Sequence, residues 1–368
     1  MIAIVCDTPY QLISAILVAD HVAKDEKIVF FINRYLYFKE QTFNYCTDHP
    51  RIDKILYYGR AHMSAGKLIA GLARPQAMLK HIDGFDKAMD FTAIIASRTT
   101  YMATYLYNEY NKRHPNLPLY LVEEGIGEYS GKIINTRFTK ACAALRQKTH
   151  LDRITRAYFS APALYPYNVA FPIEKVPTIT EDARQIIESI FGKEKICDTA
   201  GVMERFPVIF LSDPISANMT GSTASEYEQK DNLLMDTVAD TVGKENMLIK
   251  VHPIDPNFKK DGMETLYTKL PMEAILLAMN CSNKVFISSM STAMLTPKLL
   301  YASEPFLVFT YKLLEKEMSF YLSDPAHRKR YFDFMEGVMA LYRDQSRCAV
   351  PETLDELQAV LRDFTNRI

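Results

Sequence analysis

Short apolar runs alternate with amphipathic stretches along most of this chain. Uninterrupted runs of Ile, Val, Leu and Phe predict buried strands, and apolar residues that recur every three or four positions predict helices. In the first half, strands are expected at residues 2–6, 27–33, 54–58, 93–97 and 117–122. Helices are expected between them at residues 10–23, 35–46, 65–81 and 99–112. Because short strands alternating with helices form parallel sheets, this half is expected to be a doubly wound α/β domain.

The alternation breaks at residues 158–177, where four prolines and several aromatic residues predict an irregular connection. It then restarts, with strands expected at 208–212, 247–251, 284–287 and 306–309 and helices at 227–242, 272–281 and 291–301. The end of the chain is expected to be mostly helical. The sequence therefore predicts an N-terminal α/β domain with the Pro-rich connection at 1–195, a second α/β domain at 196–315 and a helical tail at 316–368.

Composition narrows the class of protein. A length of 368 residues fits two domains of roughly 150–200 residues each. Lys and Arg (43) nearly balance Asp and Glu (44), so no overall positive charge would attract nucleic acid. The six cysteines include no Cys-x-x-Cys pair, so neither a zinc site nor a disulfide framework is expected. No apolar run approaches the roughly 20 residues that span a bilayer, and Asp7 interrupts the short apolar start, so we expect a cytoplasmic protein without a signal peptide.

Three of the expected strands end in side chains that can do chemistry. Glu123-Glu124-Gly125 follows the strand at 117–122, His252-Pro253 follows the strand at 247–251, and Ser288-Ser289 follows the strand at 284–287. In open α/β sheets, ligands bind outside the carboxyl ends of the strands. The three strand ends are therefore expected to form one composite active site.

Each strand end also has a structural alternative. The two glutamates can supply a general base with a raised pKa, and Gly125 permits a tight turn beside a ligand, but a solvated acidic turn has the same sequence. Strand alternation points only one of the two carboxylates toward the site, and the sequence does not say which. His252 can protonate or hydrogen-bond a leaving phosphate, or it can be a structural histidine. The dipeptides His49-Pro50 and His114-Pro115 lie in polar stretches and are interpreted as surface turns.

The serine pair opens a further set of candidate anion and ligand contacts. Ser288, Ser289 and Ser291 lie between a strand and an expected helix, where hydroxyl and N–H groups bind anions, although capping of that helix is the simpler alternative. Glu273 opens the neighbouring helix, where it can hold ribose hydroxyls or complement the helix dipole. Asn218 lies in a small polar loop that can close over a ligand.

The order and spacing of these motifs resemble the bacterial sialyltransferases of the GT-B type. The closest likeness is to glycosyltransferase family 52, the lipooligosaccharide sialyltransferases, and to the related bacterial polysialyltransferases. Their acidic-acidic-Gly, His-Pro and Ser/Thr-pair motifs are matched by Glu123-Glu124-Gly125, His252-Pro253 and Ser288-Ser289, and the opening Thr8-Pro9-Tyr10-Gln11 is also similar. The resemblance covers residues 1 to about 310 and implies two Rossmann-like domains that face each other across a cleft.

The resemblance also implies an activity. This is an inverting transfer of sialic acid from CMP-sialic acid to a sugar hydroxyl, expected to be galactose on a surface glycan, with no metal and no cofactor. Glu124, or else Glu123, would be the general base, and His252 would act on the CMP phosphate. Residues implied to bind the donor are Ser288, Ser289, Ser291, Glu273, Pro253 and Asn218. Residues expected to bind the acceptor are Asp7, Gln11, Arg98 and Gly125. The chain contains no Asp-x-Asp motif of metal-dependent transferases.

Two alternatives stay open. The first is a GT-B transferase with another donor, such as CMP-Kdo or a UDP- or GDP-sugar. Diphosphate donors usually need Arg or Lys at the second phosphate, and the nearby candidates are only Lys250, Lys259 and Lys260, of which Lys250 is expected to alternate away from His252. The second is a non-catalytic protein that retains the fold. Expected partners are a nucleotide sugar and an oligosaccharide, without nucleic acid, and a homodimer and peripheral contact with the inner membrane stay open.

Overall fold

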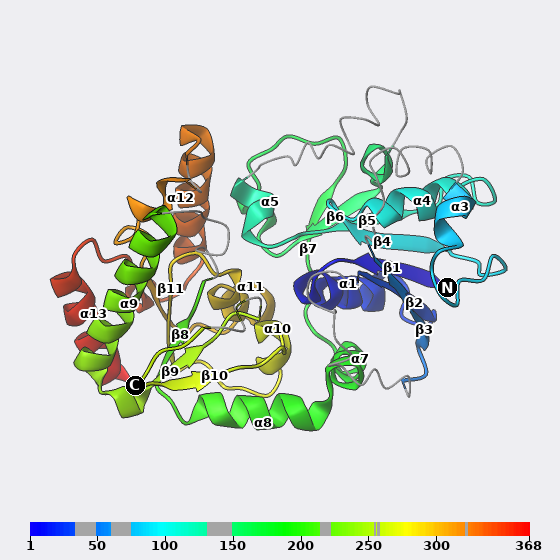
Figure 1. Ribbon diagram of the computed structural model, residues 1–368. Helices are drawn as coiled ribbons and strands as arrows, with labels where there is room; N and C mark the ends of the chain where they lie inside the picture. The colour runs from blue at the N-terminus through cyan, green and yellow to red at the C-terminus, as the bar shows by residue number, and fades with distance from the viewer. Residues whose placement is uncertain are drawn as a thin grey trace. The chain divides into compact units, whose positions relative to one another are not determined.

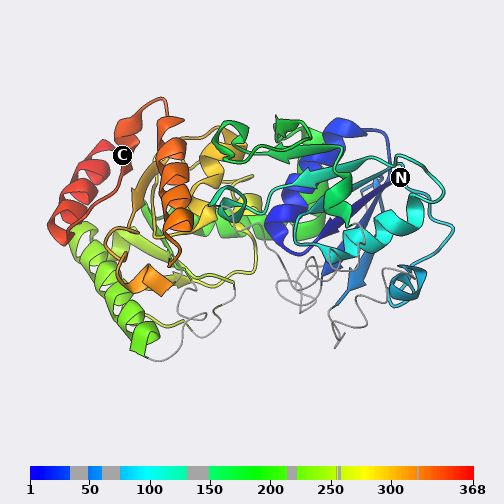
Figure 2. The same ribbon diagram turned by 90° about the horizontal axis from the view of Figure 1, so that it is seen from above.

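A computed structural model describes residues 1–33, 49–59, 75–130, 149–213, 222–253, 255, 258–320 and 323–368. The chain divides into two compact units, Met1–Lys193 and Glu194–Ile368. Figures 1 and 2 show that each unit is built around a sheet of its own, with helices packed on it. The two units are described separately below.

The first unit contains a parallel sheet of seven strands in the order β3-β2-β1-β4-β5-β6-β7. The strands are β1 (Ile2–Cys6), β2 (Ile28–Asn33), β3 (Ile52–Tyr58), β4 (Ala93–Ser97), β5 (Leu119–Val122), β6 (Arg156–Phe159) and β7 (Ile173–Lys175). Every residue of β1, β2 and β4 is buried, as expected of central strands that are covered on both faces.

Helices cover both faces of this sheet. They are α1 (Pro9–Val22), α3 (Pro75–Leu79), α4 (Tyr101–Tyr110), α5 (Ile126–Ser130) and α7 (Glu181–Phe191), with 3-10 turns η1 (His150–Arg153) and η2 (Pro162–Leu164). Figures 1 and 2 show α1 and α4 on opposite faces of the sheet. Ala3 and Val5 of β1 join the apolar core beneath α3 and α4, and α1 packs on β1 and β4. Thr8 and Gln11 form a capping box that starts α1.

The second unit contains a parallel sheet of six strands in the order β10-β9-β8-β11-β12-β13. The strands are β8 (Val208–Leu211), β9 (Met247–Lys250), β10 (Glu264–Leu266), β11 (Val285–Ser288), β12 (Phe306–Phe309) and β13 (Cys348–Ala349). The helices are α8 (Lys193–Glu204), α9 (Ser222–Val242), α10 (Met272–Ile275), α11 (Thr296–Tyr301), α12 (Pro325–Ala340) and α13 (Leu354–Arg367). The 3-10 turns are η4 (Lys244–Asn246), η5 (Thr292–Met294), η6 (Glu317–Phe320) and η7 (Gln345–Arg347). Figure 1 shows α9 and α13 side by side, and the two helices pack on each other.

The predicted doubly wound α/β architecture is confirmed in both units, and several element predictions need correction. The connection at 158–177 is less irregular than expected, because β6 and β7 fall partly or wholly within it and extend the first sheet. The helix expected at 272–281 ends at Ile275, and the one expected at 291–301 is divided into η5 and α11. Residues 316–368 are mostly helical, and they also supply β13 to the second sheet. The helix expected at 35–46 and part of that at 65–81 lie outside the described residues.

The strand orders place a ligand-binding position in each unit. In the first sheet, β2 and β3 lie on one side of β1, and β4 to β7 lie on the other. In the second sheet, β9 and β10 lie on one side of β8, and β11 to β13 on the other. Open α/β sheets bind ligands at the carboxyl ends of the strands where the order reverses in this way. These positions are the β1/β4 boundary in the first unit and the β8/β11 boundary in the second.

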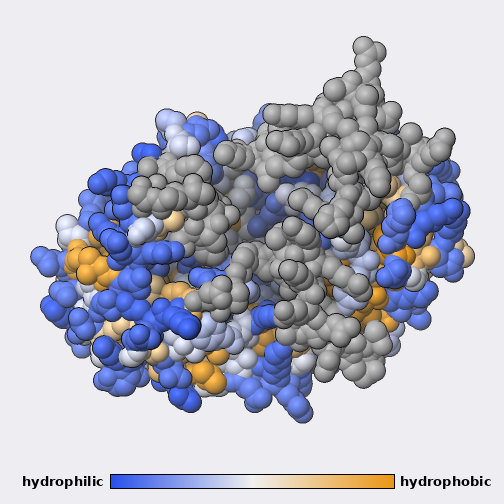
Figure 3. All heavy atoms as spheres, in the orientation of Figure 1, coloured by the Kyte–Doolittle hydropathy of each residue, from blue (hydrophilic) through white to orange (hydrophobic). Residues whose placement is uncertain are grey.

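The described part of the face shown in Figure 3 is mostly hydrophilic, with apolar residues in small separate groups. Among the described residues, the large apolar side chains that are exposed are Leu233, Tyr267, Leu341 and Ile368. Isolated apolar residues of this kind are normal on a protein surface. None of the helices in the described ranges is both long enough and apolar enough to cross a membrane.

Candidate active site

The first of the two adjacent glutamates is an internal residue. Glu123 follows β5, and its side chain is fully buried. Its carboxylate accepts hydrogen bonds from the hydroxyls of Tyr10 and Tyr129 and from the Ser160 N–H, the last at 2.9 Å. Burial raises the pKa of Glu123. A buried carboxylate with three donors connects α1, α5 and the end of β6, and it offers little access to a substrate.

The second glutamate has the opposite environment. Glu124 is partly exposed, and its Oε1 accepts a hydrogen bond from the Thr99 N–H at 2.7 Å. Thr99 follows β4, the neighbour of β5 in the sheet, so Glu124 is held at the carboxyl edge while it stays accessible to solvent. Gly125 follows with φ of +91°, a conformation that glycine adopts readily. Of the two carboxylates, Glu124 is therefore the one that is open to solvent.

A third carboxylate, Glu128, was not singled out from the sequence. It lies in α5, is fully buried, and has an Oε1 that is 3.6 Å from Nη1 of Arg98. Among the described residues, neither carboxylate oxygen of Glu128 has a hydrogen-bond partner. Burial raises its pKa to about 8, Arg98 opposes that rise, and the charges of Glu124 and Glu123 add to it. The sequence offers no clear signal for Glu128, because Glu124 lies before α5 and Gly125 turns the chain between them with φ of +91°.

The expected acceptor residues are engaged in contacts within the first unit. Arg98 is nearly buried beside Glu128. Asp7, at the β1/β4 boundary, accepts hydrogen bonds from Asn33 Nδ2 at 2.7 Å, the Tyr58 hydroxyl at 2.9 Å and the Thr100 hydroxyl at 3.3 Å. Gln11 is 2% exposed, and its Oε1 accepts the N–H groups of Asp7 and Thr8 in the helix cap. The structure gives Gln11 a local capping role, and acceptor binding by these residues stays a prediction.

His252 occupies the expected place in the second unit. It follows β9, and its N–H donates to Ser212 Oγ at 2.9 Å. Burial and the charge of Lys250 lower the pKa of His252 to about 4, so the imidazole is neutral at pH 7. The other two His-Pro dipeptides differ from each other. His114 is exposed and pairs with Asp90, as a surface turn should, but His49 is buried beside Asp182, so its interpretation as a surface residue is wrong.

Lys250 lies near His252, in contrast to the expectation from the sequence. The side chain of Lys250 is near enough to His252 for its charge to lower the pKa of that histidine, so the expectation that Lys250 alternates away from His252 is wrong. Lys250 is itself buried, which lowers its pKa to about 8, and it interacts electrostatically with Glu273. Glu273 is also buried, and its Oε1 accepts a hydrogen bond from Thr296 Oγ1 at 3.1 Å. A buried lysine and glutamate therefore lie close to His252 and α10.

The serine pair surrounds an internal carboxylate. Ser288 is fully buried and Ser289 is 2% exposed. Both hydroxyls donate to Oδ2 of Asp213, at 2.8 Å and 2.7 Å, and so do the N–H groups of Ser289 and Met290, at 3.1 Å and 3.0 Å. Asp213 lies two residues after the end of β8, and its pKa is raised by burial although these hydrogen bonds oppose the rise. The strand end predicted to bind an anion thus binds an aspartate of this chain.

The donors at this position differ from those expected. The predicted long helix after Ser291 is absent, because η5 and the short α11 take its place. Ser291 precedes η5 without a side-chain capping bond, and its N–H donates to Ser288 Oγ at 3.3 Å. The Asp213 carboxylate is therefore held by the hydroxyls of Ser288 and Ser289 and by loop N–H groups, and not by the N-terminus of a helix. Pro253 follows His252 in the loop after β9, and Asn218 lies outside the described residues.

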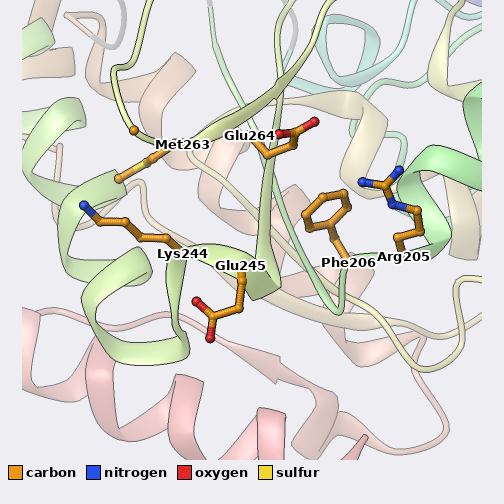
Figure 4. Close-up of a pocket in the computed structure, with 7 residues that line it drawn as sticks. Arg205, Phe206, Lys244, Glu245, Met263 and Glu264 are labelled. Atoms are coloured by element: carbon orange, nitrogen blue, oxygen red, sulfur yellow. The ribbon is translucent and has the colours of Figure 1, made fainter.

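A pocket of about 530 Å³ lies elsewhere in the second unit. Its lining residues come from the amino ends of β8, β9 and β10, as Figure 4 shows with Phe206, Lys244 and Glu264. Ligands of open α/β sheets bind at the opposite, carboxyl edge, where His252 and the serine pair lie. Within the ranges that the structure describes, no three His, Cys, Asp or Glu residues are grouped to hold a metal ion.

Comparisons with solved structures indicate the fold, and a family model indicates the family. A UDP-GlcNAc 2-epimerase structure from Methanocaldococcus jannaschii has a TM-score of 0.52 at 9% identity, covering 99% of this chain and 92% of that chain. A sialyltransferase structure from Photobacterium damsela has a TM-score of 0.44 at 12% identity, covering 95% and 81%. No curated protein sequence matches. The family model described as alpha-2,8-polysialyltransferase (POLYST) matches residues 71–309, well over half of the chain, and this range includes Glu124, His252 and Ser288-Ser289. The chain therefore belongs to the alpha-2,8-polysialyltransferase family and is a sialyltransferase with the GT-B fold.

Proposed function

We propose that this protein transfers sialic acid from CMP-sialic acid to a sugar hydroxyl, with inversion at the anomeric carbon and without a metal ion. Membership of the sialyltransferase family supports the transferred sugar. The observation that carries the mechanism is the accessible, anchored carboxylate of Glu124 beside the fully buried Glu123. A cytoplasmic location, with peripheral contact to the inner membrane where lipooligosaccharide or capsule is made, is part of the proposal.

In the proposed reaction, Glu124 is the general base. Its carboxylate accepts the proton of the acceptor hydroxyl as that oxygen attacks the anomeric carbon, and CMP leaves from the opposite side. The Thr99 N–H at 2.7 Å fixes one carboxylate oxygen and leaves the other to accept the proton.

The donor groups of the second unit would stabilise the leaving CMP. The neutral imidazole of His252 can donate a hydrogen bond to the phosphate, and an approaching phosphate would raise the pKa of His252 toward the charged form. Ser288 and Ser289 would supply hydroxyl and N–H donors. Glu273 is proposed to meet the ribose. A monophosphate carries less charge than a diphosphate, so these groups and Lys250 can suffice without a metal ion.

The acceptor has two candidates. The resemblance noted in the sequence favours galactose, whereas the description of the matching family favours a terminal sialic acid. A galactose acceptor is neutral, and a sialic acid acceptor carries a carboxylate that Arg98 could bind. Parallel reactions with lactose and with sialyllactose separate the two, since each product differs from its acceptor by one sialic acid in mass.

The donor is tested by measuring nucleotide release with a panel of sugar nucleotides. The purified protein is incubated with CMP-sialic acid, CMP-Kdo, UDP-galactose or GDP-mannose, with lactose and sialyllactose present, in buffer with and without EDTA. We expect CMP release only from CMP-sialic acid, with equal rates in both buffers. Turnover of another donor alone would contradict the donor assignment, and loss of turnover in EDTA that Mg²⁺ restores would contradict metal independence.

A further inference from the structure

The carboxylate of Asp213 fills the anion position formed by the serine pair. One oxygen, Oδ2, receives the Ser288 and Ser289 hydroxyls and the N–H groups of Ser289 and Met290, all within 2.7–3.1 Å. Four donors on a single oxygen are typical of a site built to hold an anion. Asp213 follows β8 and the serines end β11, so this oxygen lies at the β8/β11 boundary where the strand order reverses.

The same four donors are the ones that a phosphate at this position would need. A hydroxyl or an N–H has one hydrogen to donate, so its full strength goes to one acceptor at a time. With Asp213 in place, the serine oxygens turn lone pairs toward an incoming ligand, and a second anion would be repelled by the carboxylate of Asp213. Asp231 of α9 does not add to this charge, because burial and the charge of Asp213 raise its pKa to about 8 and it is protonated at pH 7. The aspartate and a phosphate therefore exclude each other from these donors.

We propose that Asp213 is the internal competitor of the donor phosphate and thereby a determinant of ligand specificity. This inference deepens the proposed function and rests on it for the identity of the natural ligand. Inorganic phosphate makes no contacts outside this position, so its binding there must by itself offset the displacement of Asp213. A nucleotide also has a base and a ribose to bind elsewhere in the unit, and those contacts offset the displacement. The competition thus selects a nucleoside monophosphate group over simple anions.

The test compares Asp213→Ala with the wild-type protein by calorimetric titration with CMP and, separately, with inorganic phosphate. Asp240→Ala is the matched control, because it removes the same charge from an exposed position of α9. If the open site is a minor state of a few per cent in the wild type, Asp213→Ala should bind CMP about tenfold tighter or more. It should also gain measurable phosphate binding, and Asp240→Ala should match the wild type.

Circular dichroism checks that the variants fold, and Asp213→Asn replaces Asp213→Ala if the alanine variant does not. The amide keeps one accepting oxygen and loses the charge, so a smaller gain in affinity is expected. Unchanged or weaker binding of both ligands by a folded variant would overturn the inference and make Asp213 a residue that positions the serines. A third outcome is that the variant gains phosphate binding while neither wild type nor variant binds CMP. That result would reject CMP-sialic acid as the donor, and it would support competition between Asp213 and phosphate.

Discussion

At the scale of single residues, Glu123 and Glu124 are chemically identical neighbours with opposite surroundings. Glu123 is buried with three hydrogen-bond donors, whereas Glu124 is partly exposed and accepts a hydrogen bond from the Thr99 N–H. The sequence predicts the pair, because two carboxylates follow an apolar strand. It cannot distinguish them, because the donors to Glu123 come from Tyr10 and Ser160, distant in the sequence.

The difference predicts separate effects of substitution. Glu124→Gln keeps the shape and removes the base, so kcat should fall by about 10²–10⁴-fold with an unchanged thermal midpoint. Glu123→Gln instead replaces a buried acceptor of three hydrogen bonds and should lower the thermal midpoint. Steady-state kinetics and thermal melts of both variants check this. A Glu124→Gln enzyme with wild-type kcat would show that Glu124 is not the base.

His252 makes a prediction about pH. Burial and Lys250 hold its pKa at about 4, below the ordinary value of about 6.5. Between these values the unfolded chain binds a proton that the folded protein does not, so this residue lowers stability as the pH falls from 6.5 to 4. NMR titration of the imidazole should give the low pKa in the free protein and a higher one with CMP. An identical pKa of His252 with and without CMP would show that His252 does not contact the phosphate.

At the scale of elements, α5 carries a buried acid and begins two residues after the candidate base Glu124. Glu128 lies four residues after Glu124, and its pKa is raised by burial to about 8. The folded protein therefore holds a proton on Glu128 between pH 4.5 and 8 that the unfolded chain releases, and the stability from this residue is lost as the pH rises through 8. The sequence shows the spacing but not the burial, which depends on Arg98 and on how α5 packs.

Glu128→Gln tests this environment. The glutamine has no proton to lose, so relative to the wild type the variant should become more stable at pH 9 than at pH 5. Urea unfolding midpoints of both proteins at the two pH values measure the difference. If the difference in urea midpoint between variant and wild type is the same at pH 5 and pH 9, Glu128 is ionised in the folded protein at both pH values.

The strands were more predictable than the connections. The runs that became β1, β4 and β12 are continuous and apolar because those strands are buried on both faces, and their predicted bounds match the structure. β10 and β13 are only three and two residues long, so they carry no detectable pattern. The helix predicted at 272–281 is apolar enough to be a helix, but it ends at Ile275 and continues as turns.

At the scale of the whole molecule, the two units divide the proposed chemistry. The candidate base belongs to the first unit, and the phosphate and ribose groups belong to the second. The sequence predicts this division, because each motif follows a strand of its own domain. It does not predict that Asp213 fills the serine site, since that contact joins residues 75 and 76 positions apart.

The central claim is that the second unit binds the phosphate of a CMP donor at the β8/β11 boundary. The most direct measurement is a crystal structure with CMP bound. The account predicts a phosphate that accepts hydrogen bonds from Ser288 and Ser289 and lies within reach of His252, with the Asp213 carboxylate displaced from these donors. CMP bound elsewhere, such as in the pocket of Figure 4, or a phosphate that leaves Asp213 in place, would contradict it.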